Sequence, residues 1–132
     1  MDFSKNKTYT PLRSNRFTFD FGRDDLKGWR VDSATYEGGT LRVKVRESEQ
    51  FYHPEYFQNN AFDKEVVYLK LLDENGYDIV KTTFYGVDFQ GYKVEVDYKN
   101  ESPLMTELYF TYEEVIHELA CHNQQEEIST QG

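Results

Sequence analysis

The chain has 132 residues and a formal net charge of −9, from 15 Lys and Arg against 24 Asp and Glu. This is the length of one domain, and the acidic balance argues against a standing grip on nucleic acid, which needs clustered basic side chains. Aromatic residues make up 17% of the chain, enough to bury a core and typical of β structure. The single cysteine, Cys121, excludes an intrachain disulfide. Residues 1–9 lack the apolar core of a signal peptide, and no run of about 18 apolar residues predicts a membrane span.

Period-two alternation predicts strands in the first half of the chain. Residues 17–21 alternate Phe with polar residues, and a short strand is expected within residues 29–36, before the turn at Gly38 and Gly39. The next strand, around residues 41–46, has an apolar phase of Leu and Val. Its other phase is strongly basic: Arg42, Lys44 and Arg46.

The second half predicts a hairpin and two further strands. The apolar run at residues 66–72 leads into the turn at residues 73–76, where Asn and Gly tolerate positive φ, and residues 77–85 form the returning strand. Gly86 and Gly91 predict another turn, after which residues 92–98 and 107–112 each alternate in period two. We therefore expect a mainly β fold, an antiparallel two-sheet sandwich or barrel of six to seven strands.

Two segments predict helices instead. Residues 48–60 contain Pro54 followed by Glu55, a pattern typical of the first turn of a short helix. Residues 113–122 place Val115, Ile116 and Leu119 on one helical stripe, which predicts a C-terminal helical tail.

Three chemical motifs compete with simpler explanations. His117 and Cys121 stand four residues apart, as metal ligands on a helix do, but two ligands fall short of a zinc site, and Cys121 is expected to pack as a small apolar group. Acidic pairs, such as Glu95 with Asp97, resemble a glycosidase dyad only as any acidic sheet would. Because the chain also lacks nucleophile and phosphate-loop motifs, we expect no enzyme, no metal and no cofactor.

The tyrosines leave a sugar-binding β-sandwich open as an alternative of another class. Tyr52, Tyr56 and Phe57 lie close together in the sequence and would form its stacking platform. Tyr92, Tyr98 and Tyr112 are interpreted instead as core or interface residues, since they share the apolar phase of predicted strands.

The order of motifs between residues 14 and 113 resembles the tail-tube proteins of bacteriophages. An opening Asn-x-Phe strand at residues 15–17 is followed by a strand, an acidic turn and a short helix. The hairpin at residues 66–85 then leads to three further segments that stand in the family's order. These are Phe84-Tyr85-Gly86-Val87, Val96-Asp97-Tyr98 and Leu108-Tyr109-Phe110-Thr111-Tyr112.

The chain also departs from the family pattern. The interval between Gly22 and Gly39 is shorter than the family's long hairpin, and Asp88-Phe89 replaces the usual aromatic-Pro pair. Both a major tube protein and a minor ring, such as a tube initiator, adaptor or terminator, are compatible with this shortening.

The resemblance implies a structural virion protein of a phage tail that assembles in the host cytoplasm. Six copies would form a ring around the conduit for DNA, with other tail, baseplate or neck proteins as partners, DNA only as a transient passenger and no membrane. The expected domains are an N-terminal arm (1–13), a tail-tube-like β domain (14–113) and a helical or flexible tail (114–132). Residues 1–30 carry a net charge of +3 and the rest −12, so copies could also stack head to tail.

Two surfaces are predicted on this basis. Acidic side chains would line the lumen and repel DNA: Glu95, Asp97 and Glu107. Basic and aromatic side chains on another strand face would contact a neighbouring subunit: Arg42, Lys44, Arg46 and Tyr109.

Overall fold

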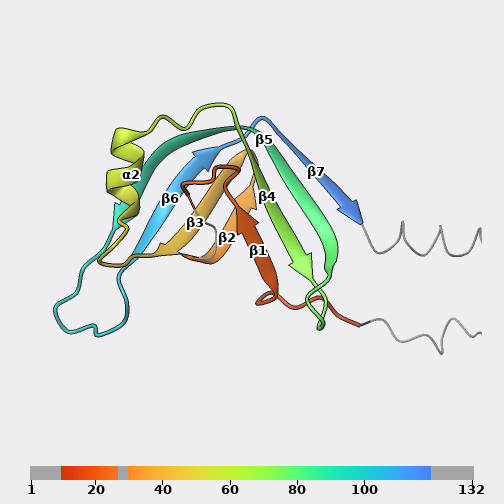
Figure 1. Ribbon diagram of the computed structural model, residues 1–132, viewed down its shortest axis with the longest axis horizontal. Coiled ribbons are helices and arrows are strands. Elements are labelled where there is room, and N and C mark those ends of the chain that lie inside the picture. Colours follow the sequence, from red (N-terminus) through yellow and green to blue (C-terminus); the bar gives the residue numbers. More distant parts are fainter. Residues whose placement is uncertain (1–9, 27–29, 120–132) are drawn as a thin grey trace, which may run out of the picture.

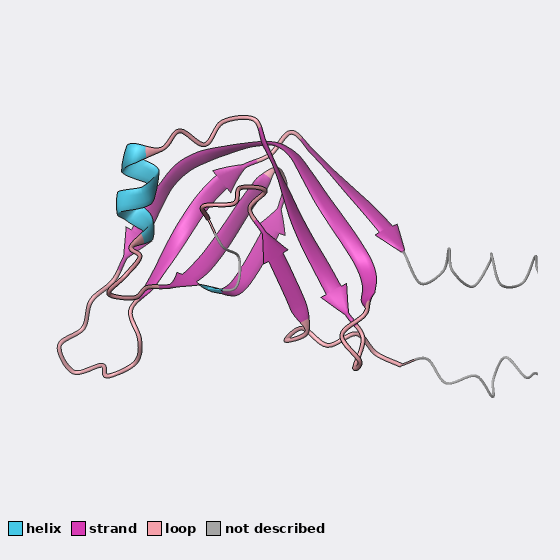
Figure 2. Cartoon of the chain, viewed as in Figure 1, coloured by secondary structure: helices cyan, strands magenta, loops and turns pink. Residues whose placement is uncertain are grey.

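The computed structural model describes residues 10–26 and 30–119, which form seven antiparallel strands and one short helix (Figures 1 and 2). This confirms the mainly β fold class expected from the alternation. The elements in chain order are β1 (Phe17–Asp20), β2 (Val31–Glu37), β3 (Thr40–Arg46), α2 (His53–Asn59), β4 (Glu65–Leu72), β5 (Asp78–Val94), β6 (Met105–Thr111) and β7 (Glu114–Leu119).

The strands follow one path, β1-β4-β5-β6-β3-β2, with β7 paired to β5 off this path. Residues 78–87 of β5 pair with β4 and β7, whereas residues 88–94 pair with β6. The long strand β5 therefore joins two half-sheets. We call β1, β4, β7 and residues 78–87 the first half-sheet, and β2, β3, β6 and residues 88–94 the second half-sheet.

The core lies between the two half-sheets. Its fully buried side chains include Leu41 and Val43 of β3, Phe84 of β5 and Phe110 of β6. Tyr36 of β2 meets Phe84 edge to face at 5.0 Å, so side chains of opposite half-sheets are in contact. Such packing of two inner faces is the source of stability in a β-sandwich.

Helix α2 lies beside the end of β5 (Figure 1). Pro54 stands in its first turn, as the sequence predicted. The Phe57 ring stacks on Phe89 at 4.2 Å and meets Phe110 at 5.9 Å. The helix therefore covers part of the inner face of the second half-sheet, around Phe89 and Phe110.

The predicted turn between Gly86 and Gly91 is wrong, because β5 runs through both glycines. Gly86 adopts a φ of 65°, and the strand register shifts close to both glycines. The glycines therefore bend the strand from one half-sheet into the other rather than ending it.

The helix predicted at residues 113–122 is also wrong where the structure describes it, since Glu114–Leu119 form strand β7. Its Val115 pairs with Phe84 and packs against the core. The open edge of β5 offers backbone partners along all six residues of β7, and this pairing outweighs the local helix propensity. Residues 120–122 lie outside the described part, as do residues 1–9 of the predicted arm (1–13) and Trp29.

Candidate functional site

The outer face of the second half-sheet brings together the two predicted surfaces. Lys44 of β3 is directly opposite Glu107 of β6, and Glu107 is directly opposite Lys93 of β5. Arg42 pairs in the same way with Tyr109. The structure thus places residues of the predicted lumen and of the predicted interface side by side on one face.

This face has mixed charge. Arg46 forms an ion pair with Asp32 of β2 at 2.8 Å, and the Arg42 guanidinium lies over the Tyr109 ring at 5.6 Å. The Tyr109 hydroxyl donates a hydrogen bond to Glu107 Oε1 at 3.2 Å. Among the described residues, neither Lys44 nor Lys93 forms an ion pair, although both flank Glu107.

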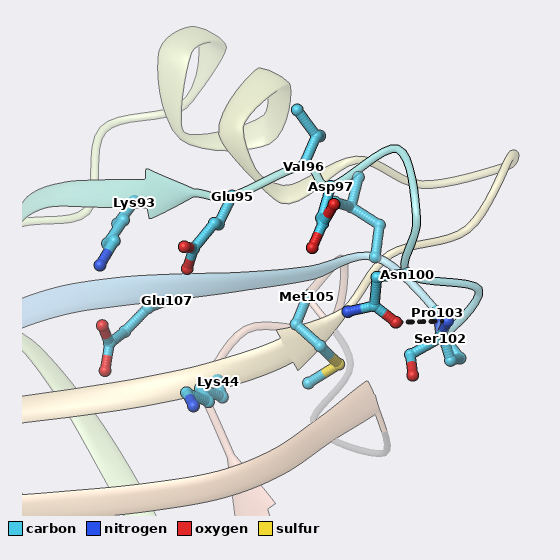
Figure 3. A pocket seen from close by; sticks show the side chains of 11 residues that line it. Lys44, Lys93, Glu95, Val96, Asp97, Asn100, Ser102, Pro103, Met105 and Glu107 are labelled. Carbon is cyan, nitrogen blue, oxygen red and sulfur yellow. Dashed lines mark hydrogen bonds between the residues drawn. The ribbon is translucent and has the colours of Figure 1, made fainter.

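The sequence predicted that Glu95 and Asp97 lie on a strand. In the structure both lie just beyond the end of β5, which ends at Val94. Together with Lys44, Lys93 and Glu107 they line an open groove of about 810 Å³ at one end of the face (Figure 3). The loop that forms the groove wall is held by backbone N–H donors: Lys99 N to Asp97 Oδ1 at 3.1 Å, Asn100 N to Asp97 O at 3.0 Å and Ser102 N to Asn100 Oδ1 at 2.9 Å.

The second half-sheet has two open edges, one at β2 and one at residues 90–94 of β5. In the described part of the chain no strand pairs with the outer side of either segment. Such edges present rows of unpaired backbone donors and acceptors, which are templates for another strand. Both edges belong to the same four-stranded unit, one at each side of it.

The hydrogen-bond parity identifies the residues at these edges. The N–H of Tyr112 donates to Gly39 O and the N–H of Glu47 donates to Leu104 O, both at 3.0 Å. Because hydrogen-bonded pairs alternate along an antiparallel ladder, these contacts fix the direction of every backbone group in β3 and β6. With the registers of β2 and β5, the outward-facing backbone groups are those of Ala34, Tyr36, Tyr92 and Val94.

A buried polar cluster lies where β3 ends and α2 begins. Glu47 Oε1 accepts hydrogen bonds from His53 N and contacts His53 Nδ1, both at 2.9 Å, and both side chains are almost fully buried. Burial alone would raise the pKa of Glu47, but its hydrogen-bond contacts with His53 work against burial, and the pKa of this carboxyl is lowered from its usual value. No sequence motif pointed to this pair.

The proposed sugar platform does not form. Tyr56 and Phe57 are buried core residues, and the Tyr56 hydroxyl donates to Asp25 Oδ1 at 3.0 Å. Burial, with this hydrogen bond, raises the pKa of Tyr56 to about 12. Only Tyr52 is exposed, so stacking rings cannot reach a sugar from this cluster.

The predicted metal ligands are only partly described. His117 lies on β7, where its Nδ1 is 3.0 Å from Thr82 Oγ1, while Cys121 lies outside the described residues. Within residues 10–26 and 30–119 no group of three or more His, Cys, Asp or Glu side chains could hold a metal ion. In the same residues no helix has the length and apolar character needed to cross a membrane.

Comparison with known proteins identifies the fold. No protein-family model matches the sequence, and no curated protein sequence matches it. Among solved structures, a chain of the anti-feeding prophage cap, described as a tube-terminating cap, matches with a TM-score of 0.73 at 12% identity. The match covers 90% of this chain and 99% of the other.

Two further matches support the same fold. A chain of the sheath/tube terminator of the PVC extracellular contractile injection system has a TM-score of 0.71 at 11% identity, over 85% and 99% of the two chains. Hcp1 from Salmonella typhimurium has a TM-score of 0.54 at 11% identity, over 79% and 86%. The chain therefore has the contractile tail-tube fold that its motif order indicated.

Proposed function

We propose that this chain is a structural, non-enzymatic subunit of a phage-tail-like contractile particle, in which six copies form a ring of the tube or its end. The observation that carries the proposal is the pair of open edges on the second half-sheet. β5, β6, β3 and β2 alternate in direction, so β2 of one copy meets residues 90–94 of the next copy in antiparallel orientation. Repetition of one heterologous contact around an axis closes a ring.

This arrangement satisfies both edges at once. Each open edge carries outward backbone groups, at Ala34 and Tyr36 on β2 and at Tyr92 and Val94 on β5. A free subunit would leave these groups as an aggregation hazard, whereas a closed ring covers all of them. Its other partners would then be the tube, sheath or baseplate proteins above and below the ring.

Two observations support a position at the end of the tube. The interval between β1 and β3 is short, and two of the matching structures are described as a tube-terminating cap and a sheath/tube terminator. We therefore favour a terminating ring over an endlessly stacking tube protein. Single rings at high concentration support this position, and stacked tubes support the alternative.

The ring proposal is tested by removing one outward N–H group. Ala34→Pro deletes the N–H that faces the open edge of β2 and leaves the ladder to β3 intact. We expect hexameric rings of the natural chain in negative-stain images and light scattering, and monomers of the Ala34→Pro variant.

The matched control is Ala34→Ser, which keeps the N–H and should form rings. Urea unfolding of both variants checks that they are folded. A natural chain that stays monomeric at millimolar concentration would contradict the proposal, as would rings of Ala34→Pro at the natural concentration.

We further propose that the outer face of the second half-sheet lines the conduit and that DNA passes along it. The face and its groove carry four basic and five acidic side chains, so a duplex meets no net positive wall. These side chains are Arg42, Lys44, Arg46, Lys93, Asp32, Glu37, Glu95, Asp97 and Glu107.

A charge reversal tests the conduit. The double variant Glu95→Lys/Asp97→Lys changes the balance by four charges per subunit at two exposed positions, so rings should form as before. Its rings should retain duplex DNA in a salt-dependent manner, measured by co-sedimentation at 50 and 200 mM salt. Equal, negligible retention by both rings would remove this face from the conduit.

A further inference from the structure

An apolar stripe continues past the end of β5 and is left uncovered. Tyr92, Val94, Val96 and Tyr98 alternate with charged residues along residues 92–98. The exposed fraction is 51% for Tyr92 and 79% for Val96, and Tyr98 is fully exposed. Three large apolar side chains in seven residues exceed the scattered exposure of an ordinary surface.

The stripe lies on the core side of the sheet. Tyr92 is directly opposite Leu108 and Val94 is directly opposite Thr106, and both of these partners are fully buried. Helix α2 contacts this side through the stacking of Phe57 on Phe89, while Tyr92 and Val96 remain exposed. The side chains of Tyr92 and Val94 therefore point the same way as the core, and Val96 and Tyr98 follow at the same two-residue spacing beyond the end of the strand.

Strand β5 ends where its internal partner ends. Val94 pairs with Thr106, next to the first residue of β6. Residues 95–98 have the alternation of a strand but no partner strand within the described residues. A strand supplied from outside on the open edge would give them backbone partners and extend β5.

The open edge of β2 has the matching chemistry. Its outward-facing residues, Ala34 and Tyr36, also direct their side chains to the core side, where they are partly buried. Side chains of neighbouring strands in a sheet share a face when they are directly opposite. Antiparallel pairing of β2 with residues 92–98 of another copy would therefore join two apolar surfaces on the same side.

We propose that residues 95–98 become strand on association and that Val96 and Tyr98 are the main apolar anchors for β2 of a second copy of this chain. The proposal rests on the proposed ring and names the residues that hold it. The hydrogen-bonded loop at Asp97, Asn100 and Ser102 holds Tyr98 in an exposed position before association. Exposed aromatic residues that become buried on association commonly dominate the energy of an interface.

The test compares the exposed stripe with an exposed aromatic residue elsewhere on the surface. In the double variant Val96→Ser/Tyr98→Ser, the concentration at half-assembly should rise at least tenfold in light scattering. Tyr77→Ser is the matched control, because Tyr77 is 70% exposed at the β4–β5 turn, away from both edges (Figure 1). The control should assemble as the natural chain does, and urea unfolding should show that both variants fold normally.

Hydrogen exchange gives a second readout that does not depend on a substitution in the stripe. The amides of residues 95–98 should exchange slowly in rings of the natural chain and rapidly in monomers of Ala34→Pro. This inference would be overturned if Val96→Ser/Tyr98→Ser assembled at the same concentration as the natural chain. Rapid exchange at residues 95–98 in rings of the natural chain would also overturn it. Either result would leave the ring proposal standing. A natural chain that remains monomeric would overturn both.

Discussion

The two half-sheets share strand β5 but differ in the length and the charge of their edge strands. The first half-sheet ends in β1, which has only four residues, and in β7, whose outer face carries Glu114 and Glu118. The second half-sheet ends in seven-residue β2 and in the apolar stripe of β5. Short and charged edges resist pairing, whereas longer edges with an apolar side favour it. The edges of the first half-sheet are therefore protected, whereas the edges of the second half-sheet have the features that favour pairing with another strand.

The largest expected difference between the half-sheets is in how much their core side chains contribute to the free energy of unfolding. Phe110 of β6 contacts Phe21, Phe57, Phe62 and Phe89, so Phe110→Ala should lower the free energy of unfolding by about 3–5 kcal/mol. Val115 of β7 is only partly buried, and Val115→Ala should cost about 1 kcal/mol.

Urea unfolding measures both costs, and the Ala34→Pro background keeps the chain monomeric so that assembly adds no stability. Similar costs for Phe110→Ala and Val115→Ala would show that β7 is as integral as β6. The contrast between a tightly packed and a loosely held half-sheet would then be wrong.

The sequence predicted those elements best whose local pattern and tertiary environment agree. Leu41, Val43 and Val45 alternate strictly with basic residues, and β3 is buried on one face and charged on the other. In β7 the pattern conflicts with the environment, because Val115, Ile116 and Leu119 fit a helical stripe as well as a strand. The choice between helix and strand is decided by pairing with the edge of β5, a segment about 30 residues or more earlier in the chain.

The sequence allowed the residues of the candidate site to be predicted, but not how these residues are arranged across the sheet. The charges of Arg42, Lys44 and Glu107 were evident, yet only the β3–β6 register puts Lys44 opposite Glu107. A sequence pattern gives the face of a strand but not the identity of its neighbour in the sheet. The same limit concealed the pairing of Glu47 with His53, because it depends on how residues 48–52 connect β3 to α2.

The last prediction compares two histidine contacts, one at the junction of β3 and α2 and one on β7. His53 is fully buried against Glu47, whereas His117 of β7 is exposed beside Thr82. Glu47→Gln removes a buried, charged hydrogen-bond acceptor and should lower the free energy of unfolding by about 2 kcal/mol at pH 7. His117→Gln should change it by less than about 0.5 kcal/mol.

The pH dependence separates a charge effect from a packing effect. The folded-state pKa of Glu47 is lowered, so its carboxylate stabilises the fold above the unfolded pKa, near 4.5, and this contribution disappears as pH falls through the folded pKa. The difference in stability between the natural chain and Glu47→Gln should therefore be constant from pH 7 to about 5 and narrow below about 4.5. Glu55→Gln, at an exposed position of the same helix, is the control and should show no such narrowing. If the difference in the free energy of unfolding between the natural chain and Glu47→Gln stayed constant down to pH 2, the charge of Glu47 would not contribute to stability. The β3–α2 junction would then be no more sensitive to charge than β7.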